Sequence, residues 1–481
     1  MTSKLFSRCL RCAFGVLLFL SFEDSPAAAQ TAPVKAGEPA ALTAAPVTSM
    51  PDLSACTALS DPKAYESKKI SDGYFYIVPG KDGWLFRTKQ DFVSDFKFHP
   101  AMKEKFKAIQ NAFASKGTDI IFTLLPTRGI VAGDRVIPGN PLAEGYDPKV
   151  AAQNYAAALA DARSYGLNVV GITKYVGDDK FFFRTDHHWT PGGAVQMARE
   201  IATFARTLPS YAKIAKNAFS TEEKGPETFE STFQEPIEDL CGVKLPDAKN
   251  TIFETSPLRV NNETALFGDS PAPQVVLVGT SNSNPDRFHP NFDGFLKEFL
   301  ETDVINAAIT GGGLDDSLLS YLGGEEYAKN PPKLIIWEIP GYYTFSSESS
   351  QKPVFDQIVP SILGNCGDKA LASSGPVSLN APSVPLFSGL SAKPLKGQNL
   401  YFALEFSSPV KKAKFTLFFR NTANKEIHKI KFKRSDRFPV DGSFFYTFQN
   451  SKVEDTDSIS IDVPENLRGG RVEARICPVP R

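Results

Sequence analysis

Short apolar runs alternate with amphipathic stretches over the first two thirds of the chain. Five runs rich in β-branched residues lie at 118–126, 167–172, 273–280, 303–309 and 332–340. Because each run is apolar without alternation, it predicts a strand buried on both faces, as in a parallel sheet. Helical patterns lie between these runs at 148–163, 191–208 and 292–300. The alternation predicts a doubly wound α/β domain.

The pattern changes after residue 366. Six short segments alternate between apolar and polar positions and are separated by turn residues, at 399–406, 413–420, 426–434, 443–449, 458–463 and 470–476. A period of two with frequent turns is typical of an antiparallel β-sandwich. The stretch 371–397 is heavy in Ser, Pro and Gly, and we expect it to be a loop.

The N-terminus has the pattern of a secretory signal peptide. Basic residues precede the short apolar run Phe14–Phe22, and Ala27-Ala28-Ala29 offers a small-residue cleavage site. Residues 30–55 are rich in Ala, Pro and Thr without periodicity, which favours a tether. We therefore expect an exported protein with a signal peptide at 1–29, a tether at 30–55, an α/β domain at 56–365 and a β-sandwich at 366–481.

Four cysteines remain after the signal peptide is removed: Cys56, Cys241, Cys366 and Cys477. An even number in an oxidising compartment favours disulfides, and the absence of any Cys-x-x-Cys pair argues against a cysteine metal site. Four cysteines allow three connectivities. The sequential pairing is the most attractive, because each bridge would close a separate stretch of chain.

A dense polar cluster, RTDHHWTPGG at 184–193, contains two of the five histidines. Thr190-Pro191 looks like an N-cap followed by proline at the first helical position, so the acid and both histidines lie on the loop before a helix. On an extended loop, residues two apart share a side, which pairs Asp186 with His188 and turns His187 away. An acid that orients an imidazole is the acid–base half of a serine-dependent catalyst.

Two other interpretations of this loop stay open. Asp186, His187 and His188 form a suggestive ligand set for a metal, but adjacent histidines on an extended chain reach one ion only with unusual backbone. Alternatively, Asp186 caps the helix by accepting hydrogen bonds from backbone donors. We expect neither a metal nor another cofactor.

The candidate nucleophile lies at the exit of a predicted strand. In open α/β sheets, ligands bind beyond the carboxyl ends of the strands. VVLVGTSNSN at 275–284 leaves its strand through Gly279-Thr280 and places Ser281 where a tight turn exposes a hydroxyl. A plain strand-to-loop turn is the alternative, and the partner base at His188 favours catalysis.

Five motifs occur in order along the chain: KDGWLF (81–86), LLPTRG (124–129), RTDHHWTPGGA (184–194), VVLVGTSNS (275–283) and LIIWEIP (334–340). Together they resemble the AlgX/AlgJ family of alginate O-acetyltransferases. The resemblance implies an SGNH-hydrolase-like domain, a carbohydrate-binding β-sandwich, and periplasmic transfer of acetyl groups to mannuronate hydroxyls of alginate. It also implies that the family's Asp-x-His motif falls on Asp186 and His188, and its serine nucleophile on Ser281.

The implied reaction is ping-pong acyl transfer. Ser281 would accept acetyl from a donor supplied by a membrane-bound O-acyltransferase, and a sugar hydroxyl would then attack, with His188 as the base in both halves. Candidates for stabilising the oxyanion are the backbone N–H groups of Ser281 or Asn282 and the side chain of Arg287. The glycines at 311–313 either supply further amides or form a plain turn. Other proteins of a polysaccharide export complex are further candidate partners.

Candidate substrate contacts lie in both domains. Arg128 follows a predicted strand and is a candidate contact for a uronate carboxylate, or else a capping or ion-pair residue. In HKIKFKR (428–434), Lys429, Lys431 and Lys433 alternate with apolar residues, so they share one outer strand face. This face is either a track for an anionic, alginate-like polysaccharide or an ordinary solvated surface. Nucleic acid would also suit the lysines, but export and the formal net charge of −1 argue against it.

The resemblance implies two further contacts in the sandwich. Lys414 and Thr416 match polysaccharide-binding positions of the family, whereas Phe418 stands where the family has tryptophan. Two other functions stay open: a secreted carbohydrate acetylesterase that uses the same triad, and a non-catalytic polysaccharide-binding scaffold of an export complex.

Overall fold

The computed structural model describes residues 49–175, 180–258, 272–284, 288–350, 352–393, 395, 399–410, 414–433, 442–448 and 455–480. The predicted signal peptide, most of the predicted tether and Arg287 lie outside the described residues. Among the residues that are described, no helix is long and apolar enough to cross a membrane.

A five-stranded parallel sheet forms the centre of the α/β part. Its order is β4 (Val169–Val170), β3 (Asp119–Leu124), β9 (Leu334–Ile339), β7 (Val275–Val278) and β8 (Val304–Asn306). Each strand falls within one of the five predicted apolar runs. Every residue of β7 and of β9 is buried, because helices cover both faces of the sheet. The predicted α/β class is therefore confirmed.

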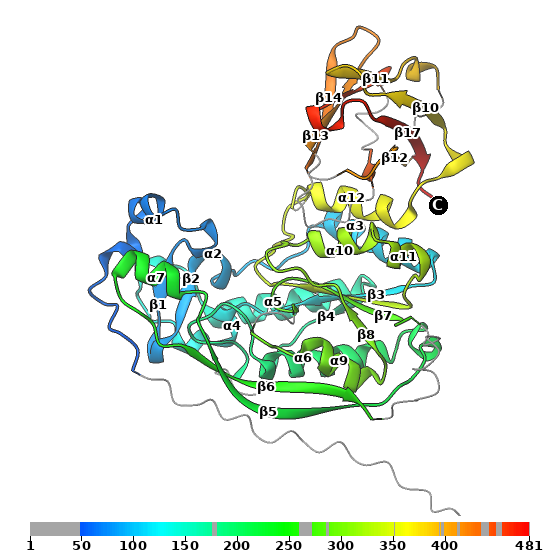
Figure 1. Ribbon diagram of the computed structural model, residues 1–481. Helices are drawn as coiled ribbons and strands as arrows, with labels where there is room; N and C mark the ends of the chain where they lie inside the picture. The colour runs from blue at the N-terminus through cyan, green and yellow to red at the C-terminus, as the bar shows by residue number, and fades with distance from the viewer. Residues whose placement is uncertain are drawn as a thin grey trace, which may run out of the picture. The chain divides into compact units, whose positions relative to one another are not determined.

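Helices lie in two layers on opposite sides of this sheet (Figure 1). One layer contains α6 (Pro191–Ala205) and α9 (Phe292–Leu300). The other contains α3 (Pro100–Ser115), α10 (Asp316–Leu322) and α12 (Lys352–Leu363), and α5 (Pro148–Ser164) packs in the same apolar cluster as these three helices. Successive residues of β9 show how the sheet serves both layers. Ile336 packs in the cluster with α6 and α9, whereas Trp337 packs in the cluster with α3 and α12.

Smaller elements surround the sheet. They are the hairpin of β1 (Ile77–Pro79) and β2 (Leu85–Arg87), the helices α1 (Pro62–Lys68), α2 (Thr88–Asp91), α4 (Arg128–Val131), α7 (Gln234–Cys241) and α11 (Glu325–Lys329), and a long two-stranded antiparallel sheet of β5 (Phe219–Phe229) and β6 (Ala248–Pro257). A disulfide joins Cys56 to Cys241, at the end of α7. The β5–β6 pair has no clear strand signal in the sequence, because most of its residues are charged or polar and only Asn250 is buried.

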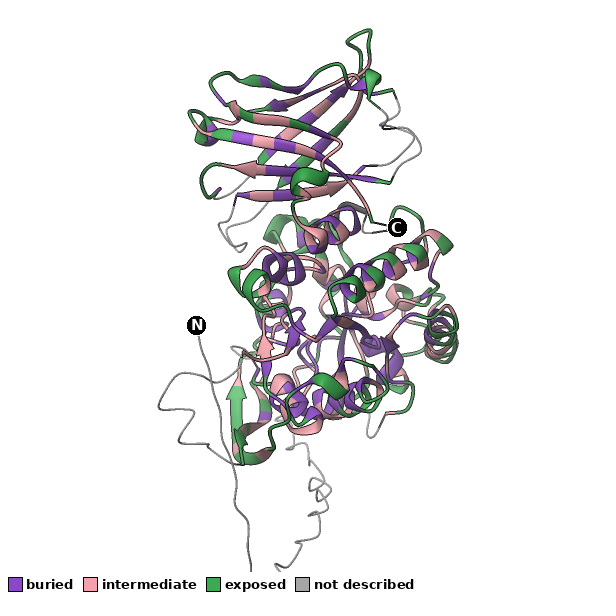
Figure 2. Ribbon diagram, turned by 90° about the vertical axis from the view of Figure 1, so that its right-hand side faces the viewer, coloured by how far each residue is buried: buried purple, intermediate pink, exposed green. Residues whose placement is uncertain are grey.

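The C-terminal part is a sandwich of two four-stranded antiparallel sheets. One has the order β10 (Ala372–Ser378), β17 (Arg471–Pro478), β12 (Leu400–Phe406), β15 (Ser443–Thr447), and the other β11 (Ser383–Phe387), β16 (Ser458–Asp462), β13 (Lys414–Arg420), β14 (Glu426–Lys433). Buried and exposed residues alternate along these strands (Figure 2). The second disulfide joins Cys366 to Cys477 of β17, so both bridges follow the sequential pairing. The predicted β-sandwich is confirmed.

The expectation that 371–397 is a loop is wrong. This stretch contains β10 and β11, and each is an edge strand of its sheet. Edge strands tolerate proline and glycine, because one side of their backbone has no ladder partner. The register of each strand shifts once, next to Pro376 in β10 and after Pro385 in β11.

Candidate active site

Ser281, His188 and Asp186 form one hydrogen-bonded chain. His188 Nε2 lies 2.7 Å from Ser281 Oγ, and His188 Nδ1 lies 2.6 Å from Asp186 Oδ1. Asp186 and His188 are buried, whereas Ser281 is half-buried at the exit of β7. The arrangement has a nucleophile, a base within hydrogen-bond reach, and an acid that orients the base, which are the parts that activate a hydroxyl for acyl transfer.

Asp186 is held in its ionised form. Burial by itself raises the pKa of Asp186, but the electrostatic interaction with the His188 ring and the hydrogen bonds that Asp186 accepts outweigh burial and hold the pKa well below its usual range. Its carboxylate accepts the backbone N–H of Thr232 at 2.7 Å and that of His188 at 2.9 Å. An ionised Asp186 accepts the Nδ1–H of His188, and this tautomer leaves Nε2 free to take the Ser281 proton.

The loop that carries Asp186 and His188 is fixed by the start of α6. Thr190, and not Asp186, caps this helix: its Oγ1 accepts the N–H of Gly193 at 3.3 Å. Gly193 is needed there because a Cβ would lie 2.4 Å from the carbonyl oxygen of Phe181. Trp189 is fully buried and donates from Nε1 to the carbonyl of Asn282 at 2.6 Å. The base loop and the turn that carries Ser281 are therefore tied directly together.

A buried carboxylate, Glu338 of β9, holds the turn that carries Ser281. Glu338 is 1% exposed and accepts from Thr280 N–H at 2.7 Å, from Thr280 Oγ1 at 2.9 Å and from Ser283 Oγ at 3.3 Å. Burial raises its pKa, although these hydrogen bonds oppose the shift. Gly279 makes the approach possible, since a Cβ there would lie 2.6 Å from Glu338 Oε2. The motif LIIWEIP contains Glu338 but indicates no role for it, because its partners lie in the turn after β7, far along the chain.

Replacing Glu338 with alanine is expected to lower the kcat for an acetyl ester by about 10- to 100-fold, with a smaller effect on KM. The reason is that Thr280 loses its buried acceptor, which lets Ser281 leave its position. Glu338→Gln keeps the volume and one acceptor oxygen, and we expect an intermediate kcat. Ester turnover and thermal unfolding check both variants.

Ile336→Val is the control on the same strand face, with an expected loss of about 1 kcal/mol in stability and an unchanged kcat. A normal kcat in Glu338→Ala would limit this residue to a role in folding.

The predicted separation of the two histidines is wrong. The rings of His187 and His188 lie with centroids 3.9 Å apart, because residues 184–188 form successive bends and not an extended strand. Potential ligand atoms of Asp186, His187 and His188 lie within 4.8 Å of one another. However, both ring nitrogens of His188 are engaged by Asp186 and Ser281, and His187 Nδ1 lies 2.8 Å from Thr232 Oγ1. The donor atoms thus fit a hydrogen-bonded triad better than a ligand set.

The candidate oxyanion donors have different positions. The side chain of Asn282 is buried and directs Nδ2 toward Thr280 Oγ1 at 3.3 Å and Glu338 Oε1 at 3.4 Å, so it is part of the turn and not a free donor. The backbone N–H of Asn282 also points to Thr280 Oγ1, at 3.3 Å. Within the described part of the chain, the N–H of Ser281 makes no hydrogen bond. Of the candidate donors in the described residues, the Ser281 N–H is therefore the one that remains available to the oxyanion.

The glycines at 311–313 form a turn. The N–H of Gly312 donates to the carbonyl of Ile309 at 3.1 Å. Gly311 and Gly313 have φ values of 68° and 64°, which residues with side chains rarely adopt. The geometry agrees with the plain-turn interpretation.

Arg128 forms a buried ion pair, which agrees with the ion-pair alternative from the sequence and not with the substrate-contact one. It is 2% exposed, and its guanidinium donates to the carbonyls of Leu85, Phe183 and Arg184 and pairs with Asp91 at 3.0 Å. A buried guanidinium with these partners cannot reach a sugar. Arg128 instead holds the segment that leads into Asp186.

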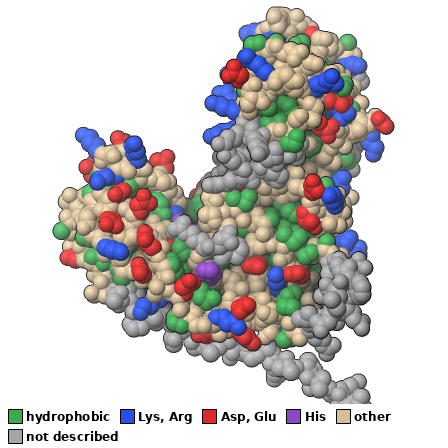
Figure 3. Space-filling view, viewed as in Figure 1, with side chains coloured by type: hydrophobic (Ala, Val, Ile, Leu, Met, Phe, Trp, Pro, Cys, Tyr) green, Lys and Arg blue, Asp and Glu red, His purple; other side chains and the backbone are tan. Residues whose placement is uncertain are grey.

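The lysines predicted to share a strand face do so. Lys429, Lys431 and Lys433 of β14 are exposed, and Lys431 and Lys433 lie opposite Thr416 and Lys414 of β13. Basic side chains are visible on the surface over these strands (Figure 3). Phe418 lies opposite Lys429 on the same face, and the Arg420 guanidinium is 5.5 Å from its ring centroid. The face combines cations with one aromatic ring.

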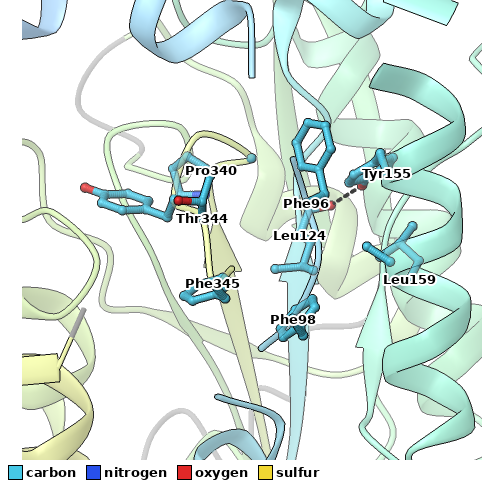
Figure 4. Close-up of a pocket in the computed structure, with 11 residues that line it drawn as sticks. Phe96, Phe98, Leu124, Tyr155, Leu159, Pro340, Thr344 and Phe345 are labelled. Carbon is cyan, nitrogen blue, oxygen red and sulfur yellow. Dashed lines mark hydrogen bonds between the residues drawn. The ribbon is translucent and has the colours of Figure 1, made fainter. Parts of the chain in front are cut away.

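An apolar pocket lies at the carboxyl ends of β3 and β9 (Figure 4). Phe96, Leu124, Tyr155 and Phe345 are among its lining residues, and Tyr155 donates to the Leu124 carbonyl at 2.6 Å. None of the lining residues belongs to the triad, and none carries a charge. The pocket offers nothing that would recognise a uronate.

Comparisons with known proteins show relatives of most of the chain. Residues 77–341 match the family described as SGNH hydrolase-like domain, acetyltransferase AlgX. The alginate biosynthesis protein AlgX of Pseudomonas aeruginosa is 31% identical, over 88% of this chain and 88% of that protein. The probable alginate O-acetylase AlgJ of Pseudomonas fluorescens is 29% identical, over 58% of this chain and 71% of that protein. The solved structure of Pseudomonas aeruginosa AlgX superposes with a TM-score of 0.73 at 28% identity, covering 88% of this chain and 99% of that one.

Proposed function

The chain belongs to the AlgX family of SGNH hydrolase-like acetyltransferases, and from this premise we propose that it transfers acetyl groups to hydroxyls of an alginate-like polysaccharide. The observation that carries the proposal is the hydrogen-bonded chain from Ser281 Oγ through His188 to Asp186. A serine activated in this way accepts an acyl group and passes it on. The names of the AlgX and AlgJ relatives supply the polymer and the group transferred.

The reaction has two halves that use the same residues. In the first, His188 Nε2 takes the proton of Ser281 as Oγ attacks the acetyl carbonyl of the donor, and it returns that proton to the leaving group. In the second, a sugar hydroxyl gives its proton to His188 and attacks the acetyl-serine, and Ser281 leaves with the proton. Asp186 stabilises the imidazolium in both halves, and the Ser281 N–H stabilises the developing oxyanion.

Transfer must outcompete hydrolysis, and binding of the polymer provides the advantage. A polysaccharide held beside the acetyl-serine has a high effective concentration relative to an unbound acceptor. We assign this binding to the sandwich at 366–481, through Lys414, Thr416, Lys429, Lys431 and Lys433. The acetyl donor is the product of a membrane-bound O-acyltransferase, and other proteins of the polysaccharide export complex are partners. The periplasm is the proposed compartment, and the disulfides Cys56–Cys241 and Cys366–Cys477 are consistent with it.

One assay tests the proposed function. The protein is incubated with an activated acetyl ester, with and without oligomannuronate, and the sugar products are analysed by mass spectrometry. Acetylated oligomannuronate is the expected product. Free acetate alone, at the same rate with and without the sugar, would indicate a carbohydrate esterase. No ester turnover at all would indicate a polysaccharide-binding scaffold.

Replacing Lys429, Lys431 and Lys433 together with glutamine is expected to weaken binding of polymannuronate roughly tenfold at low salt, because three exposed attractions are lost. The dependence of Kd on salt concentration should become shallower, since salt screens exposed charges. Calorimetric titration at several salt concentrations measures both effects. The control is a triple variant that combines Lys369→Gln, Lys393→Gln and Arg468→Gln. It removes the same charge from exposed positions elsewhere in the sandwich. Equal weakening by both triple variants would mean that only net charge matters.

A further inference from the structure

Arg87, the last residue of β2, is a buried arginine whose guanidinium has no hydrogen-bond partner among the described residues. It is 5% exposed. Among the residues that the structure describes, its guanidinium makes one ion pair, from Nη2 to Asp91 Oδ1 at 3.8 Å, and no hydrogen bond. Its Nε is shielded from solvent and has no acceptor. A guanidinium carries five N–H donors, so almost all of its capacity is unused.

Asp91 does not satisfy the hydrogen-bond donors of the Arg87 guanidinium, because its carboxylate interacts with two arginines. Its Oδ2 accepts the backbone N–H of Arg87 at 2.8 Å and Nη1 of Arg128 at 3.0 Å. Arg128 is otherwise satisfied by backbone carbonyls. The group of Arg87, Arg128 and Asp91 therefore carries one excess positive charge inside the protein. Asp186, the acidic member of the triad, is committed to His188.

Arg87 lies close to His187, the neighbour of the base His188. Its guanidinium is 5.7 Å from the ring centroid of Tyr342 and 6.0 Å from that of Tyr74. Tyr74 Oη lies 3.5 Å from His187 Nδ1, and the ring centroids of His187 and His188 lie 3.9 Å apart. Tyr342 follows β9 at the edge of the sheet where Ser281 follows β7.

Electrostatics agrees with this position. Burial lowers the pKa of His187 well below its usual value, and the nearby charges of His188 and Arg87 lower it further. His187 therefore stays neutral beside the base, and Arg87 supplies the positive charge on this side of the site.

We propose that Arg87 binds the carboxylate of the anionic acceptor sugar beside Ser281. The inference rests on the proposed function, because a uronate polymer presents one carboxylate on each sugar. A planar guanidinium matches a carboxylate in two parallel hydrogen bonds, and two flanking tyrosine rings hold its plane. Arg87 thus takes the role that the sequence suggested for Arg128. It selects for a charged acceptor, whereas His188 and Ser281 carry the chemistry.

The test compares a charged and an uncharged acceptor on each protein, wild type and variant. Arg87→Met removes the cation with little change in length, and Arg87→Lys keeps the charge but not the paired donors. Wild type is expected to prefer oligomannuronate over its methyl ester by about 10- to 100-fold in kcat/KM, and Arg87→Met is expected to lose most of that preference through a higher KM for the free acid. Arg87→Lys should recover part of it. Lys89→Met removes an exposed charge two residues away and should keep the wild-type preference.

An unchanged preference in Arg87→Met would overturn the inference. If kcat/KM falls equally on the acid and on its methyl ester, the preference is unchanged and Arg87 only supports the fold. Because both acceptors are measured on the same protein, reduced stability of the variant does not affect the comparison.

Failure of the proposed function is distinguishable from failure of this inference. If wild type acetylates no sugar, the proposed function fails, and binding still tests Arg87. Calorimetric titration with trimannuronate is then done in the variant with glutamine at 429, 431 and 433, so that the sandwich lysines do not mask the site. Weaker binding after Arg87→Met, about tenfold or more, supports the carboxylate contact. Equal binding refutes it.

Discussion

Ser281→Ala is expected to abolish the acetyl-enzyme and to lower acetyl transfer by at least about 10³-fold. Ser281 is the hydroxyl that lies 2.7 Å from His188 Nε2. Neighbouring hydroxyls cannot take its place, because Thr280 Oγ1 and Ser283 Oγ both point at the buried Glu338, at 2.9 and 3.3 Å. The alanine side chain fits without strain, since Ser281 is only half-buried. We therefore expect a folded protein without a nucleophile.

Intact-protein mass spectrometry after a short exposure to an activated acetyl ester measures the acetyl-enzyme directly. Wild type should carry one acetyl group, and Ser281→Ala should carry none. Ser283→Ala is the matched comparison in the same turn. It removes a hydroxyl with one long hydrogen bond, and we expect a loss of turnover of about tenfold or less. A stable acetyl adduct on Ser281→Ala at the wild-type rate would place the nucleophile elsewhere in the chain.

The residues of the triad could be predicted because each has a local signal. Asp186 and His188 stand just before a recognisable helix start, and Ser281 follows an apolar run that reads as a strand. What the sequence does not contain is the pairing of the loop with the strand exit, 93 residues apart. The parallel sheet supplies that pairing, since it brings the carboxyl ends of its strands to one edge.

The parts that could not be predicted depend on the path of the backbone or on remote partners. The orientation of His187 follows from successive bends, which no period of two describes. Arg128 follows a strand and Arg87 ends one, and both side chains are buried. Only their hydrogen-bond partners among the described residues distinguish them: Arg128 donates to backbone carbonyls, whereas Arg87 Nε has no acceptor. Glu338 and Thr232 act through contacts with residues far along the chain. Edge strands β10 and β11 resemble loops because edge positions accept proline.

Asp186→Asn is expected to lower kcat by about 10⁴-fold at neutral pH while leaving the fold in place. The carboxylate accepts Nδ1–H of His188 at 2.6 Å and the N–H of Thr232 at 2.7 Å. An asparagine keeps its oxygen for one donor and turns its amide toward the other. If the amide faces His188, Nδ1 must accept, and Nε2 then carries the proton and cannot take the one from Ser281. Ester turnover measures the loss. Asp303→Asn, which removes an exposed carboxylate paired with Lys297, should leave kcat within about threefold of wild type.

The same substitution has a predictable effect on stability as pH changes. The pKa of Asp186 is lower in the folded protein than in the unfolded chain, so its ionisation stabilises the fold above the unfolded-state pKa of about 3.9, and that contribution is lost as pH falls further. Wild type should therefore lose free energy of unfolding on acidification below about pH 4, and Asp186→Asn should lose less over the same range. Chemical unfolding at pH 3, 4 and 6 measures the difference. If the free energy of unfolding changes with pH by the same amount in the two proteins, then Asp186 is not held ionised by His188. In that case the tautomer argument for the loss of kcat would fail with it.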